Sequence, residues 1–114
     1  MRVSTWKRIE PNEFPGVYLS GPMTGRPDLN RAEFARWEML LRSCGVQNVF
    51  NPAAQDRPED WTWERHMMAD LQELVSGKYG MLLLLPDHDC SRGSALEMKV
   101  AAAIGMKVVK AVWT

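Results

Sequence analysis

The hydrophobic residues of the chain recur with two different periods, which predict alternating strands and helices. Short runs that are β-prone or apolar throughout predict four strands: residues 17–20, 46–50, 79–85 and 107–113. Apolar residues at helical spacing, each series closed by a glycine, predict three helices: residues 30–44, 60–75 and 91–104. Asn30 and Glu33 are spaced as a capping pair at the start of the first helix.

Strands that alternate with helices over short connections predict a parallel sheet, because parallel neighbours need a helical crossover. We therefore expect one α/β domain over residues 1–114, with a three-layer αβα, Rossmann-like or flavodoxin-like fold and a sheet of about four to five strands. Ligands of such sheets bind at the carboxyl ends of the strands. The loops that follow Ser20, Phe50 and Leu85 are therefore expected to converge on a site.

The composition narrows the class of partner. The formal net charge is zero and the pI is about 6.7, which argues against nucleic acid and against anionic membranes as partners. No run of residues reaches transmembrane length, and residues 1–15 lack the apolar core of a signal peptide. The two cysteines suggest neither a disulfide framework nor a zinc motif. We expect a cytoplasmic protein that binds a small molecule, with no metal and no cofactor.

Two carboxylates stand out as candidates for chemistry. Asp70 lies three residues after Met67 and four before Leu74, at the edge of an apolar helical stripe. Partial burial there raises the pKa of an acid and suits it to proton donation, although a structural pair with an arginine, a lysine or a helix N-terminus is the alternative. Glu97 follows the start of a helix whose dipole favours negative charge, so we expect it to stay ionised. Its alternative is a solvated side chain.

The turns around these elements carry residues suited to ligand binding. Ser91, Gly93 and Ser94 either cap the last helix or hold a phosphate or a sugar hydroxyl. Small residues within 18–25 allow the backbone to approach a ligand, although they lack the spacing of a Walker loop or a dinucleotide-binding motif. Trp63 falls on a helical apolar face and is interpreted as a core residue.

Together these residues resemble a known family, the nucleoside 2-deoxyribosyltransferases, with the related 2'-deoxynucleoside 5'-monophosphate N-glycosidases and small uncharacterised phage and bacterial proteins. The resemblance runs from about residue 17 to residue 109. Four segments carry it: Val17 to Pro22, Asp70-Leu71, Pro86-Asp87 after the apolar strand, and Ser91-x-Gly93-x-x-x-Glu97 followed by Ala101 and by Gly105 to Val109.

The resemblance implies a reaction at the N-glycosidic bond of a 2'-deoxynucleoside or its 5'-monophosphate. Glu97 is then the nucleophile, or the carboxylate that stabilises the cation, at C1' of the sugar. Asp70 is the acid that assists departure of the base, and Tyr18 orients Glu97. Breaking this bond develops oxocarbenium character, which requires a fixed carboxylate below C1' and an acid near the base. The resemblance also implies a homodimer or a larger homo-oligomer.

The same resemblance implies where the rest of the substrate binds. The residues expected to line the substrate site are Gly21, Pro22, Met23, Ser91, Gly93 and Ser94. Ser91 stands where the monophosphate glycosidases carry a serine on the phosphate. The loop after the first strand lacks the polar or basic contacts of that branch, so Arg26 or Arg92 is expected to contact a phosphate.

Two other functions stay open. One is a non-catalytic nucleotide-binding or sequestering protein, since residues 22–24 depart from the family pattern. The other is an N-glycosidase of a ribonucleotide or an NAD-like substrate, because Gly93-Ser94-x-x-Glu97 resembles the end of the Pro-Gly-Gly-x-Gly-Thr-x-x-Glu run of the cytokinin-type phosphoribohydrolases. Hydrolysis and transfer to a second base also stay undecided, since they differ in the access of water to the sugar-enzyme intermediate.

Overall fold

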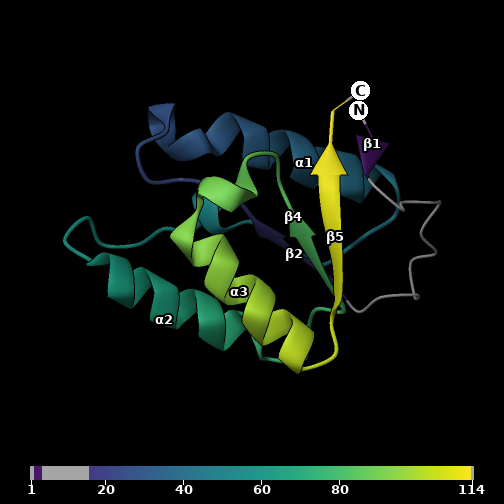
Figure 1. Ribbon diagram of the computed structural model, residues 1–114. Coiled ribbons are helices and arrows are strands. Elements are labelled where there is room, and N and C mark those ends of the chain that lie inside the picture. Colours follow the sequence, from purple (N-terminus) through teal and green to yellow (C-terminus); the bar gives the residue numbers. More distant parts are fainter. Residues whose placement is uncertain (1, 4–15, 114) are drawn as a thin grey trace.

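The computed structural model describes residues 2–3 and 16–113 of the chain (Figure 1). The helices among them are α1 (Arg31–Ser43), α2 (Trp63–Leu74) and α3 (Arg92–Ala103). The strands are β1 (Arg2–Val3), β2 (Val17–Ser20), β3 (Val49–Phe50), β4 (Met81–Leu84) and β5 (Lys107–Val112). Short 3-10 helices follow three of the strands: Pro27–Asn30, Pro52–Ala54 and His88–Cys90.

The strands form one sheet in the order β1-β5-β4-β2-β3. β2, β3, β4 and β5 are parallel, and β1 pairs with β5 as an antiparallel edge strand. The predicted α/β fold with a parallel sheet is therefore confirmed for the described residues. The chain passes from β2 to β3 on one side and then to β4 on the other, so the strand order reverses between β2 and β4. Open α/β sheets bind ligands at such a reversal.

Helices cover both faces of the sheet (Figure 1). Val17 and Leu19 of β2 belong to the core cluster that contains Trp37 of α1. Successive side chains of a strand point to opposite faces, so Tyr18 and Ser20 point the other way, towards α2 and α3. The alternation in β2 therefore sends a phenol and a hydroxyl to the face on which the candidate carboxylates lie.

The residue before β2 is a glycine that its surroundings leave no room to replace. A Cβ atom at Gly16 would lie 2.8 Å from the backbone oxygens of Asn48 and Lys78. The close approach allows Val17 N–H to donate to Asn48 O and Gly80 N–H to donate to Gly16 O, both at 2.9 Å. These bonds fix the register of β2 against β3 and β4. The positions of the β2 side chains that follow are fixed with it.

The strand predicted at residues 17–20 matches β2, and the other predicted elements are longer than those in the structure. The strand predicted at residues 46–50 is only Val49–Phe50, because Gly45 adopts a φ of 98° and Val46 N–H donates to Leu41 O at 3.1 Å, which closes the end of α1. α2 begins at Trp63, since the Thr62 side chain accepts from a backbone N–H of its first turn and acts as the N-cap.

The predicted capping pair at the start of α1 is wrong. Asn30 has a left-handed backbone with a φ of 63°, and its side-chain amide donates to Pro22 O at 3.0 Å. The Glu33 carboxylate accepts from the indole N–H groups of Trp37, at 2.8 Å, and Trp113, at 2.7 Å. These two residues therefore fasten the loop after β2 and the end of the chain to α1.

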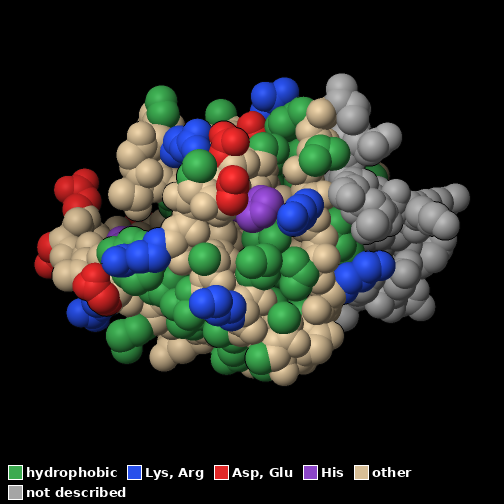
Figure 2. All heavy atoms as spheres, viewed as in Figure 1, with side chains coloured by type: hydrophobic (Ala, Val, Ile, Leu, Met, Phe, Trp, Pro, Cys, Tyr) green, Lys and Arg blue, Asp and Glu red, His purple; other side chains and the backbone are tan. Residues whose placement is uncertain are grey.

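The surface carries charges of both signs. On the face that Figure 2 shows, acidic and basic side chains are interspersed among hydrophobic and other groups. Within the described part of the chain, no helix is long and apolar enough to cross a membrane.

Candidate active site

A cavity of about 950 Å³ opens at the carboxyl ends of β2, β3 and β4. Its walls come from residues 21–24 after β2, from Pro52 to Glu59 after β3, and from residues 90–93 after β4. The predicted convergence of these three loops is confirmed. α2 contributes Asp70 and α3 contributes Glu97 to the same cavity. The two carboxylates selected from the sequence therefore face the same cavity.

Glu97 is held by hydrogen bonds from β2. Its exposed fraction is 6%, because Ser94, Glu97 and Ala101 form the buried face of α3 against the sheet. The Tyr18 hydroxyl donates to Oε2, and the Ser20 hydroxyl donates to Oε1 at 2.7 Å. Ser20 Oγ also lies 2.8 Å from Ser94 Oγ. The expected contact between Tyr18 and Glu97 is thus present, and Ser20 is a second donor that we did not expect.

The environment of Glu97 corrects the prediction that it stays ionised. Burial raises the pKa of its carboxyl group to about 7; the hydrogen bonds from Tyr18 and Ser20 act against burial, and the charge of Asp70 acts with it. The dipole of a helix acts mainly within its first turn, and Glu97 lies in the second turn of α3 with its side chain turned to the sheet. Desolvation therefore outweighs the helix dipole.

Asp70 is paired with an arginine that the sequence did not single out. Arg57 Nη2 lies 2.6 Å from Asp70 Oδ1, and Arg57 Nη1 lies 3.2 Å from His66 Nδ1. Burial raises the pKa of Asp70, as predicted, while the hydrogen bond and the charge of Arg57 lower it in part. The structural alternative considered for Asp70, a pair with an arginine, is thus present at the wall of the cavity.

Tyr18 lies between the Glu97 carboxylate and the backbone of Asp70. Its side chain is fully buried, its hydroxyl donates to Glu97, and the hydroxyl also lies 3.3 Å from the backbone oxygen of Asp70. Burial raises the pKa of Tyr18 far above its ordinary range, so the phenol stays protonated and acts as a donor. Glu97, which ionises near neutrality, and Asp70, whose pKa is also raised, therefore both line the cavity, an arrangement suited to acid-assisted bond cleavage.

The small residues around the cavity have different roles. Gly21, Pro22, Met23, Ser91 and Gly93 line it, and their assignment to a substrate site stays a prediction. Ser91 is also the N-cap of α3, since its hydroxyl accepts from the Ser94 N–H at 3.1 Å. Ser94 does not line the cavity. Its hydroxyl is buried and lies 2.8 Å from Ser20 Oγ, so it supports the carboxylate through Ser20.

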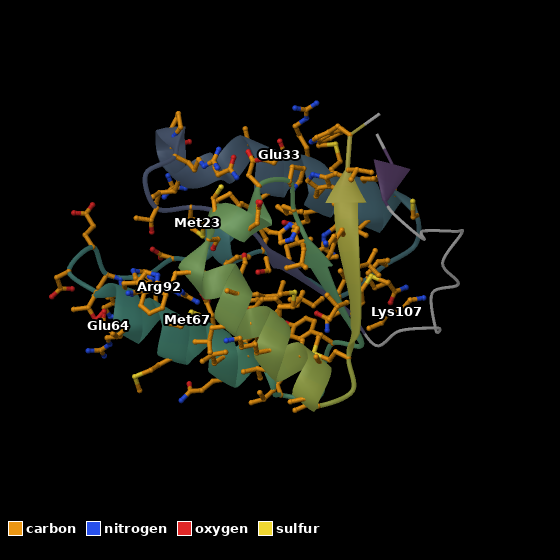
Figure 3. All side chains as sticks on the ribbon, viewed as in Figure 1. Met23, Glu33, Glu64, Met67, Arg92 and Lys107 are labelled. Atoms are coloured by element: carbon orange, nitrogen blue, oxygen red, sulfur yellow. The ribbon has the colours of Figure 1, made fainter. Side chains whose placement is uncertain are left out.

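The two arginines expected at a phosphate are placed differently. Arg92 lines the cavity, with its guanidinium 3.5 Å from the centre of the Trp63 ring. Arg92 and Met67 of α2, both labelled in Figure 3, line the cavity together. Arg26 lies outside the cavity wall and pairs with Asp87 at 3.3 Å. Trp63 is half-buried and lines the cavity, so its interpretation as a core residue is wrong.

Comparison with curated proteins finds no match. A family described as a domain of unknown function, DUF4406, matches residues 15–110. The match covers every strand and helix that lines the cavity, and with them Tyr18, Arg57, Asp70 and Glu97. The chain belongs to the DUF4406 family.

Proposed function

We propose that the protein cleaves the N-glycosidic bond of a 2'-deoxynucleoside or its 5'-monophosphate and passes the sugar to water or to a second base. The observation that carries this proposal is the Glu97 carboxylate, buried at the cavity wall and held on both oxygens by Tyr18 and Ser20. A carboxylate fixed in this way suits attack on an oxocarbenium-like centre.

The proposed reaction divides the work between the two carboxylates. An oxygen of Glu97 forms a bond to C1' while the bond from C1' to the base nitrogen breaks, and Asp70 gives its proton to the departing base. Water or a second base then attacks C1', and the bond to Glu97 breaks. The proton of the attacking group returns to Asp70, which restores the starting state.

The proposed division requires Glu97 to be ionised while Asp70 holds its proton. Glu97 attacks as a carboxylate, and burial raises its pKa to about 7, so the reactive form accumulates above neutrality. Asp70 donates as an acid, and burial raises its pKa as well.

The shape and the polar lining of the cavity also support a nucleotide. Its volume of about 950 Å³ falls within the range of small-molecule sites. Arg92 and the Ser91 hydroxyl lie at the start of α3, where backbone N–H groups favour an anion. The resemblance of the chain to the deoxyribosyltransferases and monophosphate glycosidases points to the same class of substrate.

The test is release of free base, separated by liquid chromatography, from a panel of 2'-deoxynucleosides and their 5'-monophosphates. Glu97→Gln and Asp70→Asn should each reduce the rate by about a hundredfold or more. Glu64→Gln is the matched control, because Glu64 is an exposed glutamate in the first turn of α2. No release by the wild type, or equal release by Glu97→Gln, would refute the proposal.

Further substrates in the same panel test the substrate class and distinguish hydrolysis from transfer. Ribonucleotides and NAD test the other glycosidic substrates, and a second free base tests transfer against hydrolysis. Thermal stabilisation by nucleotides without turnover would favour a binding protein.

We further propose a cytoplasmic homodimer, which fits the unpaired Cys44 and Cys90 and the resemblance. Light scattering on the purified protein tests the dimer.

A further inference from the structure

Arg57 reaches the cavity from the segment between the 3-10 helix at Pro52–Ala54 and α2. Its guanidinium binds two side chains of α2 at once, Asp70 and His66. The side chains of Arg57 and Asp70 are only 13% and 14% exposed. An ion pair this well covered is attenuated less by water and salt than one on the surface.

Aromatic rings hold Arg57 in place. Its guanidinium carbon lies 5.6 Å from the centre of the Trp61 ring, and the centres of the Trp61 and His66 rings lie 5.3 Å apart in a T-shaped arrangement. Arg65 covers Trp61 as well, at 4.9 Å. The segment before α2 is thereby fixed to α2 around the Arg57 side chain, and the direction of the guanidinium towards Asp70 is defined.

The pair uses one oxygen of Asp70 and leaves the other available. Arg57 occupies Oδ1, and within the described part of the chain Oδ2 takes part in no hydrogen bond. Every fully buried polar side-chain atom of the described residues has a partner, so Oδ2 retains accessible surface. Asp70 lines the cavity, which makes Oδ2 the atom that a bound molecule can meet.

We propose that Arg57 is the positioning residue of Asp70, which fixes Oδ1 so that Oδ2 carries the proton to the departing base. This inference rests on the proposed function. Arg57 does not touch the reacting atoms in this arrangement. It determines which oxygen faces the base, and its charge limits how firmly Asp70 retains the proton.

The charges around Asp70 give Arg57 a measurable effect. Burial raises the pKa of Asp70, and Arg57 is the strongest influence in the opposite direction. The other ionisable groups that face it are His66 on α2, which lowers its pKa, Glu97 on α3 and Tyr18 on β2. Removal of the Arg57 charge should therefore make Asp70 retain its proton to higher pH.

The experiment compares Arg57→Gln, Arg57→Lys and the wild type. Carbon-13 NMR follows the titration of the Asp70 carboxyl group, whose signal is identified by its loss in Asp70→Asn. We expect the titration to move to higher pH in Arg57→Gln and to return towards the wild type in Arg57→Lys, which keeps a positive charge. Arg65→Gln is the matched control, because Arg65 packs on the same tryptophan without touching Asp70.

Base release by the same variants provides a second readout. In Arg57→Gln the alkaline limb of the pH profile should move to higher pH, and kcat should fall about tenfold or more. In Arg57→Lys the alkaline limb should stay at the pH of the wild type, while kcat should fall. A titration of Asp70 that is the same in Arg57→Gln and the wild type overturns the inference. So does an unchanged pH profile and kcat. If the wild type releases no base, the proposed function fails, while the NMR titration still decides whether Arg57 controls Asp70.

Discussion

Glu97→Gln should make the protein more stable at neutral and alkaline pH. The amide preserves the shape of the carboxyl group and its contacts. Tyr18 can donate to the amide oxygen, and the amide nitrogen can donate to Ser20, which then turns its own proton to Ser94, 2.8 Å away. The substitution thus removes a buried negative charge while every polar atom around it keeps a partner.

The size of the effect follows from the pKa of Glu97. Its ordinary value is 4.5, and burial raises it to about 7 in the folded protein. Between these values the unfolded chain has released the proton while the folded protein retains it, so stability falls as pH rises through this window. The total loss is about 3 kcal/mol, of which about 2 kcal/mol falls between about pH 5 and about pH 8.

Urea denaturation followed by tryptophan fluorescence measures the effect. The quantity of interest is the free energy of unfolding of Glu97→Gln minus that of the wild type, because groups common to both proteins, such as Asp70, largely cancel. This difference should rise by about 2 kcal/mol from about pH 5 to about pH 8. The exposed Glu64→Gln should show no such rise. A difference for Glu97→Gln that is independent of pH would refute the reasoning.

Three further predictions concern other parts of the site and the sheet. Tyr18→Phe removes a hydrogen-bond donor that lowers the pKa of Glu97. The acid limb of the pH profile of base release should therefore move to higher pH, and the rate at neutral pH should fall roughly tenfold. Tyr79→Phe, outside the cavity, should leave the profile unchanged. Gly16→Ala should destabilise the fold by about 2 kcal/mol or more in urea denaturation, because the new Cβ would lie 2.8 Å from two backbone oxygens; a loss below about 0.5 kcal/mol would contradict this packing. Ser91→Ala should cost about 1 kcal/mol through loss of the N-cap of α3, and a rise in KM for monophosphates but not for nucleosides would assign its hydroxyl to the phosphate as well.

The order of the elements could be predicted because it depends on local patterns. The continuous apolar run that contains β4 and the helical spacing of the α1 and α2 side chains are visible in the sequence without knowledge of their partners. The predicted role of Asn30 failed because tertiary contacts decided it. Its amide binds the loop after β2, and Glu33 binds two tryptophans, one of them 80 residues away in the chain.

The residues of the candidate site could be predicted better than their protonation and their ion pairs. Tyr18, Asp70 and Glu97 were found by their position and by resemblance, and they do line or support one cavity. The protonation of Glu97 was missed because it depends on burial between three elements, which no local pattern reveals. Arg57 was missed because a single arginine in an irregular segment has no periodic signal, and its partner lies thirteen residues away.

The residues that anchor Glu97 and the residues that line most of the cavity lie in different parts of the fold. Tyr18, Ser20, Ser94 and Glu97 all lie on β2 and α3, whereas much of the remaining cavity wall lies in the three loops. A loop can lengthen or change its side chains without moving a strand or a helix. Related chains can therefore diverge in the molecules they accept while the same hydroxyl groups hold the same carboxylate, and comparison of their loops should reveal specificity sooner than comparison of their cores.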